Sequence, residues 1–163
     1  MLDRRSGPTR YRNAGMQVQE IMTAAVVTAD ADDEVREVAR LMRDQNVGSV
    51  VICDPDGAPA AMITDRDLAT RIVASERDGA EPIGDHVSTP LVTAEPVMGL
   101  EEAAALMVQH RVRRLPVVQG DELLGIVTLD DIAVRTGDLD VAQRMTHRVI
   151  EGALPEFFFH ERG

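Results

Sequence analysis

Two Thr-x-x-Asp tetrapeptides are the residues of this chain best suited to hold a ligand. Thr64 and Asp67 form the first, and Thr128 and Asp131 form the second. Each threonine is predicted to end a strand, and each aspartate to lie in the first turn of the helix that follows. At such a position the hydroxyl and the free backbone N–H groups of the helix start can face a phosphate. The carboxylate can accept both hydroxyl protons of a ribose.

The same spacing also fits a purely structural role. A threonine followed three residues later by an acidic residue resembles a capping box, in which side chains and backbone N–H groups at a helix start satisfy one another. Taken alone, one tetrapeptide does not distinguish helix capping from ligand binding.

The tetrapeptides belong to a long internal repeat. Residues 18–74 and 83–138 align at a spacing of 65 residues, which becomes 64 after one residue is lost in a turn. Each copy predicts the order β-α-β-β-α, from apolar stripes at helical spacing and from apolar runs joined by turns. Two copies of one unit usually pack about a pseudo-twofold axis, and the clefts between them suit a small ligand.

We therefore predict a mixed α/β fold in four parts. These are a flexible basic arm over residues 1–15, a first repeat over 16–76, a second repeat over 77–138, and a C-terminal helix with a tail over 139–163 that contains Phe157, Phe158 and Phe159.

Composition excludes several classes of function. The net charge of −11 argues against a general nucleic-acid or anionic-membrane surface, and no apolar stretch is long enough to span a bilayer. The single cysteine, Cys53, lies in an apolar run and is expected to be a buried hydrophobe in a reducing cytoplasm. The histidines have no metal-like spacing, and no nucleophilic triad or P-loop occurs, so neither a metal site nor catalysis is expected.

The repeat closely resembles the cystathionine β-synthase (CBS) domain, in the tandem arrangement called a Bateman module. The resemblance covers about residues 17–138 and is carried by segments 21–23 and 63–68 in the first copy and 110–118 and 125–131 in the second. It implies two repeats packed by pseudo-twofold symmetry, flat homodimers, and adenosine-containing ligands such as AMP, ADP or ATP in the clefts. Finding the tetrapeptide in both copies of this pattern favours the ligand interpretation over capping alone.

The resemblance also implies two unequal sites, because the Thr and Asp of one copy face the adenine-binding wall of the other. A phosphate chain is expected to favour the site that contains Thr64, because Arg66 stands there in the position that Asp130 has in the site that contains Thr128. The site that contains Thr128 is expected to be empty, to bind a nucleoside, or to need Mg²⁺. The first site joins Thr128, Asp130 and Asp131 with Thr23, Thr28, Val47, Gly48 and Ser49, and the second joins Thr64, Arg66 and Asp67 with Ser88, Thr93, Val112, Arg113 and Arg114.

The sequence thus predicts a stand-alone, non-catalytic energy sensor that needs no cofactor, binds an adenine nucleotide as a regulatory ligand, forms a homodimer and acts on an unknown protein partner. One alternative is a dimerisation scaffold whose clefts have lost their ligand. A weaker alternative is a nucleic-acid-binding regulator that uses the basic arm.

Overall fold

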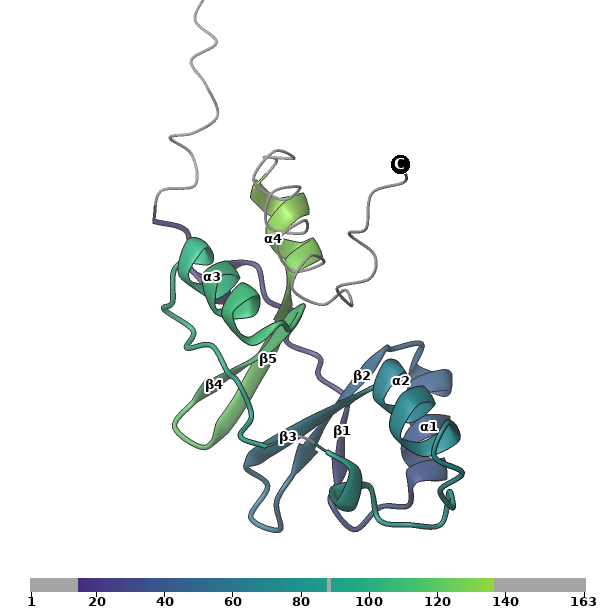
Figure 1. Cartoon of the computed structure of the whole chain (residues 1–163). Helices are drawn as coiled ribbons and strands as arrows, with labels where there is room; N and C mark the ends of the chain where they lie inside the picture. The colour runs from purple at the N-terminus through teal and green to yellow at the C-terminus, as the bar shows by residue number, and fades with distance from the viewer. Residues whose placement is uncertain (1–14, 88, 137–163) are drawn as a thin grey trace, which may run out of the picture. The chain divides into compact units, whose positions relative to one another are not determined.

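The computed structural model describes residues 15–87 and 89–136, and it confirms the predicted mixed α/β class (Figure 1). The chain divides into two compact units. One, here called the Thr64 unit, contains residues 23–93 and 118–125. The other, here called the Thr128 unit, contains the described residues of 1–22, 94–117 and 126–163. The predicted C-terminal helix and the Phe157–Phe159 tail lie outside the described residues.

A three-stranded sheet organises the Thr64 unit. Strand β2 (Ser49–Cys53) lies in the middle, parallel to β1 (Thr28–Asp30) and antiparallel to β3 (Pro59–Thr64). Every residue of β2 is buried, which explains why its sequence is a continuous apolar run rather than an alternating one. Strand β1 pairs with β2 from Thr28, which lies opposite Val51.

Helical segments of the same unit share a hydrophobic core with this sheet. Helix α1 (Val35–Gln45) buries Val35, Val38 and Met42, which recur at the spacing of one helix face. The chain leaves β3 through the short helix α2 (Asp65–Asp67) and continues as the π-helical turn η3 (Leu68–Val73). Packing of these apolar faces on the sheet therefore fixes the end of β3, where the first tetrapeptide lies.

The Thr128 unit contains the second helix pair and the base of the second hairpin, whose residues 118–125 belong to the Thr64 unit. Helix α3 (Leu100–His110) buries Ala103, Ala104 and Met107, and it is followed by strands β4 (Arg114–Gln119) and β5 (Glu122–Thr128). Helix α4 (Leu129–Thr136) begins directly after β5 and contacts α3. The second tetrapeptide thus occupies the same strand-to-helix junction as the first.

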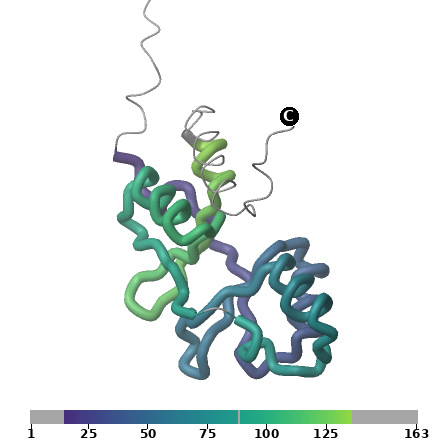
Figure 2. The backbone as a smooth tube through the Cα atoms, viewed as in Figure 1, coloured from purple at the N-terminus to yellow at the C-terminus, as the bar shows by residue number. Residues whose placement is uncertain are grey.

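The opening turn of each sequence repeat lies in the unit of the other repeat (Figure 2). In the Thr128 unit, the N–H of Val18, in η2 (Val18–Glu20), donates to the carbonyl of Met98 at 2.9 Å. In the Thr64 unit, the N–H of Ile83, in η4 (Ile83–His86), donates to the carbonyl of Asp33 at 2.8 Å. The two compact units therefore do not coincide with the two sequence repeats. The boundaries predicted for the repeats stay a prediction.

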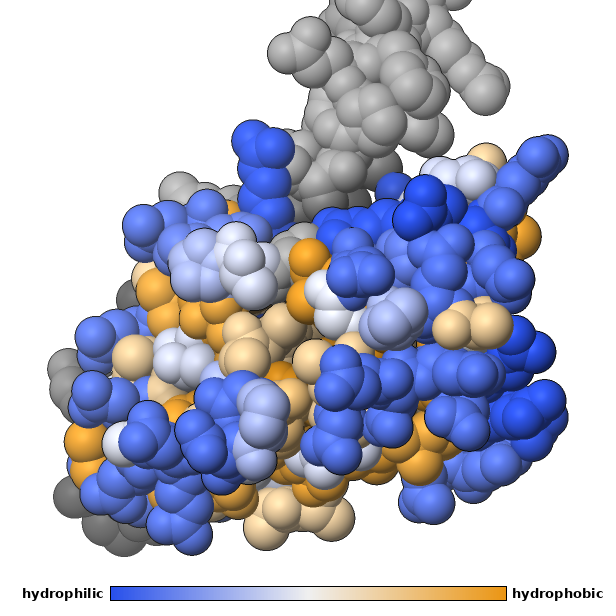
Figure 3. Space-filling model, turned by 90° about the horizontal axis from the view of Figure 1, so that it is seen from below, coloured by the Kyte–Doolittle hydropathy of each residue, from blue (hydrophilic) through white to orange (hydrophobic). Residues whose placement is uncertain are grey.

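Hydrophilic residues cover most of the face shown in Figure 3, and apolar residues appear between them in patches. Among the described residues, the large apolar side chains that are mostly exposed are Val73, Val97 and Val134.

Candidate functional site

The first tetrapeptide forms a closed capping box at the junction of β3 and α2. The Asp67 carboxylate oxygen Oδ2 accepts from the Thr64 N–H at 3.0 Å and from the Thr64 hydroxyl at 2.6 Å. The Asp67 N–H donates back to the Thr64 hydroxyl oxygen at 3.2 Å. Both side chains are half-buried, so these bonds fix the rotamer of the carboxylate.

The second tetrapeptide repeats this geometry at the junction of β5 and α4. Oδ2 of Asp131 accepts from the Thr128 N–H at 2.8 Å and from the Thr128 hydroxyl at 2.7 Å. The Asp131 N–H donates to the Thr128 hydroxyl oxygen at 3.1 Å. The capping interpretation is therefore confirmed in both repeats. It does not exclude ligand binding, because each box uses only one of the two carboxylate oxygens.

The second carboxylate oxygen, Oδ1, distinguishes the two repeats. Oδ1 of Asp67 lies 3.3 Å from Nε of Arg71, one helical turn further along. Arg135 has the same spacing from Asp131, but within the described ranges no ion pair joins them and no donor bonds to Oδ1 of Asp131. The Thr128 repeat therefore presents an oriented carboxylate oxygen that can still accept hydrogen bonds.

The backbone N–H groups of the first helix start are already satisfied, which corrects the expectation that they are free to face a phosphate. The Asp65 N–H donates to the carbonyl of Gly48 at 3.2 Å, and the Arg66 N–H donates to Oδ1 of Asp65 at 2.8 Å. The Asp67 N–H is held in the capping box. Asp65 also places a negative charge at this helix start, which opposes the approach of a phosphate.

The second helix start is more open. The Leu129 N–H donates to the carbonyl of Arg113 at 2.9 Å, but the apolar side chain of Leu129 has no acceptor like that of Asp65. In the part of the chain that the structure describes, no acceptor is found for the Asp130 N–H. The difference between Asp65 and Leu129 therefore leaves one amide available beside Asp131.

The two strand-to-helix junctions that hold the tetrapeptides are here called the Thr64 corner and the Thr128 corner. The structure brings some of the other predicted site residues to them. Ser49 is buried and pairs with Thr64 in the sheet register, so Gly48 and Ser49 lie beside the Thr64 corner, although they were expected in the other site. Nη2 of Arg113 lies 3.8 Å from Oδ2 of Asp130, so these two residues, predicted for different sites, meet in one unit.

The remaining predicted residues differ in how far they are exposed. Ser88 lies outside the described residues. Thr23, Thr28 and Arg66 are exposed, whereas Val47, Thr93, Val112 and Arg114 are half-buried.

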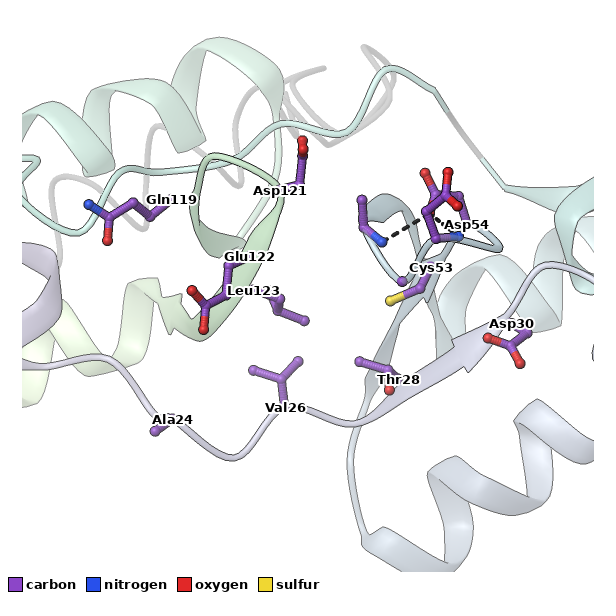
Figure 4. A pocket seen from close by; sticks show the side chains of 13 residues that line it. Ala24, Val26, Thr28, Asp30, Cys53, Asp54, Gln119, Asp121, Glu122 and Leu123 are labelled. Atoms are coloured by element: carbon purple, nitrogen blue, oxygen red, sulfur yellow. Dashed lines mark hydrogen bonds between the residues drawn. The ribbon is translucent and has the colours of Figure 1, made fainter.

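An open, acidic pocket of about 950 Å³ lies in the Thr64 unit, and neither tetrapeptide contributes to its lining (Figure 4). Its wall carries no basic side chain, so it does not suit an anionic phosphate. Over the residues that the structure describes, no group of three or more His, Cys, Asp or Glu side chains is arranged to hold a metal ion. The residues that line the pocket are Ala24, Val26, Thr28, Asp30, Cys53, Asp54, Asp56, Gly57, Ala58, Gln119, Asp121, Glu122 and Leu123.

Cys53 and Glu81 are among the titratable side chains of the Thr64 unit whose pKa values are shifted. Burial raises the pKa of the Cys53 thiol, and the nearby Asp30 and Asp54 carboxylates add to the shift. The N–H of Asp78 donates to Oε1 of Glu81 at 3.1 Å, and this bond lowers the pKa of the Glu81 carboxyl. Arg77, at 2.7 Å from Oε2 of Glu81, lowers it further. The buried position confirms the expectation that Cys53 acts as a small hydrophobe.

Arg71 contacts Asp67 of the first tetrapeptide, and the sequence analysis did not single it out. Its Nη1 donates to the carbonyl of His86 at 3.1 Å while its Nε faces Asp67, so it joins the Thr64 corner to η4. The spacing of four residues from Asp67 is a recognised signal for an ion pair on a helix surface, and it was visible in the sequence.

Comparisons with known proteins agree with this architecture. A family model described as the CBS domain matches residues 18–74 and 83–135. The chain is 44% identical over 117 residues to the CBS domain-containing protein YhcV of Bacillus subtilis, covering 72% of this chain and 83% of YhcV. No helix among the described residues is both long and apolar enough to cross a membrane.

Two solved structures are also similar. One is the CBS domain protein PAE2072 of Pyrobaculum aerophilum complexed with AMP, with a TM-score of 0.70 and 25% identity over 79% of this chain and 99% of that one. The other is a hexameric CBS-CP12 protein from bloom-forming cyanobacteria, with a TM-score of 0.69 and 30% identity over 77% of this chain and 73% of that one.

Proposed function

Because the chain belongs to the CBS domain family, we propose that it is a non-catalytic regulatory module that binds an adenosine-containing ligand at its Thr-x-x-Asp corners. AMP, ADP and ATP are the first candidates. The part that the other repeat plays in each site stays a prediction.

The observation that carries this proposal is the carboxylate oxygen Oδ1 of Asp131, to which no residue that the structure describes donates. Two bonds from Thr128 hold the carboxylate through Oδ2, at 2.7 and 2.8 Å, so Oδ1 is oriented before any ligand arrives. An acceptor that is already oriented loses little conformational entropy on binding. Hydroxyl groups of a ribose are suitable donors, because hydrogen bonds to an ionised carboxylate are stronger than neutral ones. The AMP complex of the similar protein PAE2072 supports this choice of ligand.

Regulation requires more than binding. A ligand shifts a conformational equilibrium only by as much as its affinity differs between the two conformations. We propose that occupancy changes the surface that the module presents to a protein partner, and the size of any effect is limited by that difference in affinity.

We further propose that the module is a homodimer formed through its η3 and α4 helical surfaces. Val73 in η3 is 74% exposed and Val134 in α4 is 78% exposed, and an interface through these two helices would remove both side chains from water. A twofold dimer is the commonest symmetric assembly, and the similar CBS-CP12 protein is itself an oligomer.

The dimer is tested by light scattering on the Val73→Glu and Val134→Glu variants. We expect the mass of the dimer for the wild type and of the monomer for the double variant. Val97→Glu is the matched control, since Val97 is 59% exposed but lies outside both helices. A monomeric wild type at micromolar concentration contradicts the proposal.

The ligand proposal is tested by thermal unfolding with AMP, ADP, ATP, NAD, S-adenosylmethionine and cyclic dinucleotides. A ligand of the native state raises the melting temperature progressively once its concentration exceeds its dissociation constant. We expect at least one adenosine-containing compound to do so. If none of them shifts the transition, the module is a scaffold and this proposal is wrong.

A further inference from the structure

We infer that Arg71 determines ribose selectivity at the Thr64 corner, so that this corner accepts one ribose hydroxyl while the Thr128 corner accepts two. The inference rests on the proposed function, and it adds to it a difference in ligand chemistry between the two repeats.

The argument begins with the number of acceptor positions on each carboxylate. An ionised carboxylate offers about four lone-pair positions, two on each oxygen. On Asp67, Oδ2 receives two donors from Thr64, and Oδ1 is ion-paired with Nε of Arg71 at 3.3 Å, which takes up one of its two positions. On Asp131, Oδ2 receives two donors from Thr128, and no described residue donates to Oδ1. One position therefore stays open on Asp67 and two stay open on Asp131.

Arg71 is not a side chain that a ligand can easily push aside. Its Nη1 also donates to the carbonyl of His86 at 3.1 Å, so one hydrogen bond and one ion pair hold the guanidinium in place. His86 is itself 8% exposed, and its ring nitrogen Nε2 lies 2.9 Å from Oε2 of Glu81. Replacing the guanidinium by a neutral hydroxyl would exchange a charge-assisted ion pair for a weaker contact, because both partners of the pair are ionised.

The two corners should therefore respond differently to removal of a ribose hydroxyl. At the Thr128 corner, both 2′-deoxy-AMP and 3′-deoxy-AMP lose a bond to a charged acceptor, which should weaken binding about tenfold or more. At the Thr64 corner only one hydroxyl has an acceptor. At least one of the two analogues should therefore bind there within about threefold of AMP, because its missing hydroxyl had no acceptor to lose.

The experiment is titration calorimetry on variants in which one corner has been inactivated. The Asp131→Asn background isolates the Thr64 corner, and the Asp67→Asn background isolates the Thr128 corner. In the first background, adding Arg71→Ala opens the second acceptor position, so both analogues should now bind about tenfold or more weakly than AMP. Arg71→Lys, which keeps a cation near Oδ1, should retain the tolerance of the parent.

Arg135→Ala is the matched control, because Arg135 has the same spacing from Asp131 but no bond to it. It should leave the ratio between AMP and each analogue unchanged in both backgrounds. Melting curves of the apo variants report whether Arg71→Ala remains folded. If it does not, the Arg71→Lys variant and the comparison of the two single-corner backgrounds decide the question.

Three results overturn the inference. They are equal discrimination at the two corners, an unchanged ratio in Arg71→Ala, and an Asp131→Asn protein that binds no nucleotide with or without Arg71. If the wild type binds AMP and one of these results is found, only the inference fails. If the wild type binds no adenine nucleotide at all, the proposed function fails with it.

Discussion

Replacing Asp131 by asparagine or by alanine separates helix capping from ligand binding. In the proposed function the carboxylate has two roles on different oxygens, because Oδ2 accepts two bonds from Thr128 and Oδ1 would accept from the ligand. In Asp131→Asn the amide oxygen can still accept from Thr128, while an NH₂ group replaces Oδ1. In Asp131→Ala both functions are lost.

The expected magnitudes differ between the two measurements. Loss of a capping side chain costs about 0.5–2 kcal/mol of unfolding free energy, so Asp131→Ala should be destabilised by about 1 kcal/mol. Asp131→Asn should lie within about 0.5 kcal/mol of the wild type, since the cap is retained. Both variants should lose about 1.5–3 kcal/mol of AMP binding at this corner, because both lack the charged acceptor.

Urea unfolding and titration calorimetry measure these two quantities separately. The Asp67→Asn background removes the contribution of the other corner from the binding data. If Asp131→Asn binds AMP as tightly as its parent, Oδ1 is not a ligand acceptor. If Asp131→Ala is weakened in binding only, and not in stability, the capping box does not contribute as described.

Three further predictions concern the Thr64 unit. Thr64→Val removes both capping bonds of the hydroxyl and should lower the urea unfolding free energy by about 1 kcal/mol, whereas Thr70→Val, on the exposed helix surface, should change it by less than about 0.5; equal losses would contradict this. Because burial raises the pKa of Cys53, iodoacetamide should alkylate it far more slowly in the native protein than in urea, and stability should fall as pH rises above about 8.5, where the unfolded chain ionises first. Equal alkylation rates would show that the thiol is accessible. The folded pKa of Glu81 is lowered, so its contribution to stability should be present above about pH 4.3 and be lost as pH falls through the folded pKa. Glu81→Gln should therefore flatten this part of the pH–stability curve. An unchanged curve would assign the loss of stability to other carboxyl groups.

Local patterns in the sequence were sufficient to predict most of the fold. The apolar stripe of Val35, Val38 and Met42 predicted the buried face of α1, and the apolar run that ends at Cys53 predicted the first strand of a hairpin. The exchange of opening turns between units was not predicted. It is made by backbone bonds between distant segments, such as Val18 to Met98, and backbone donors leave no side-chain pattern to read.

The candidate site, like the fold, was predictable from the sequence only in part. The spacing of the tetrapeptides predicted both capping boxes, because a box depends on residues three apart. It did not predict which carboxylate oxygen stays open. That depends on whether the arginine four residues later turns toward the aspartate, as Arg71 does and Arg135 does not. The sequence places an arginine at both positions, and only tertiary contacts such as that of Arg71 with His86 distinguish them.

The central claim is that the carboxylate oxygen left over by each capping box receives the ribose of an adenosine-containing ligand. A crystal structure of the full chain grown with AMP tests it most directly. We expect the ribose hydroxyls within hydrogen-bond distance of Oδ1 of Asp131, with the Thr128 capping bonds intact. AMP bound elsewhere, with neither Asp131 nor Asp67 in contact with its ribose, would contradict the claim.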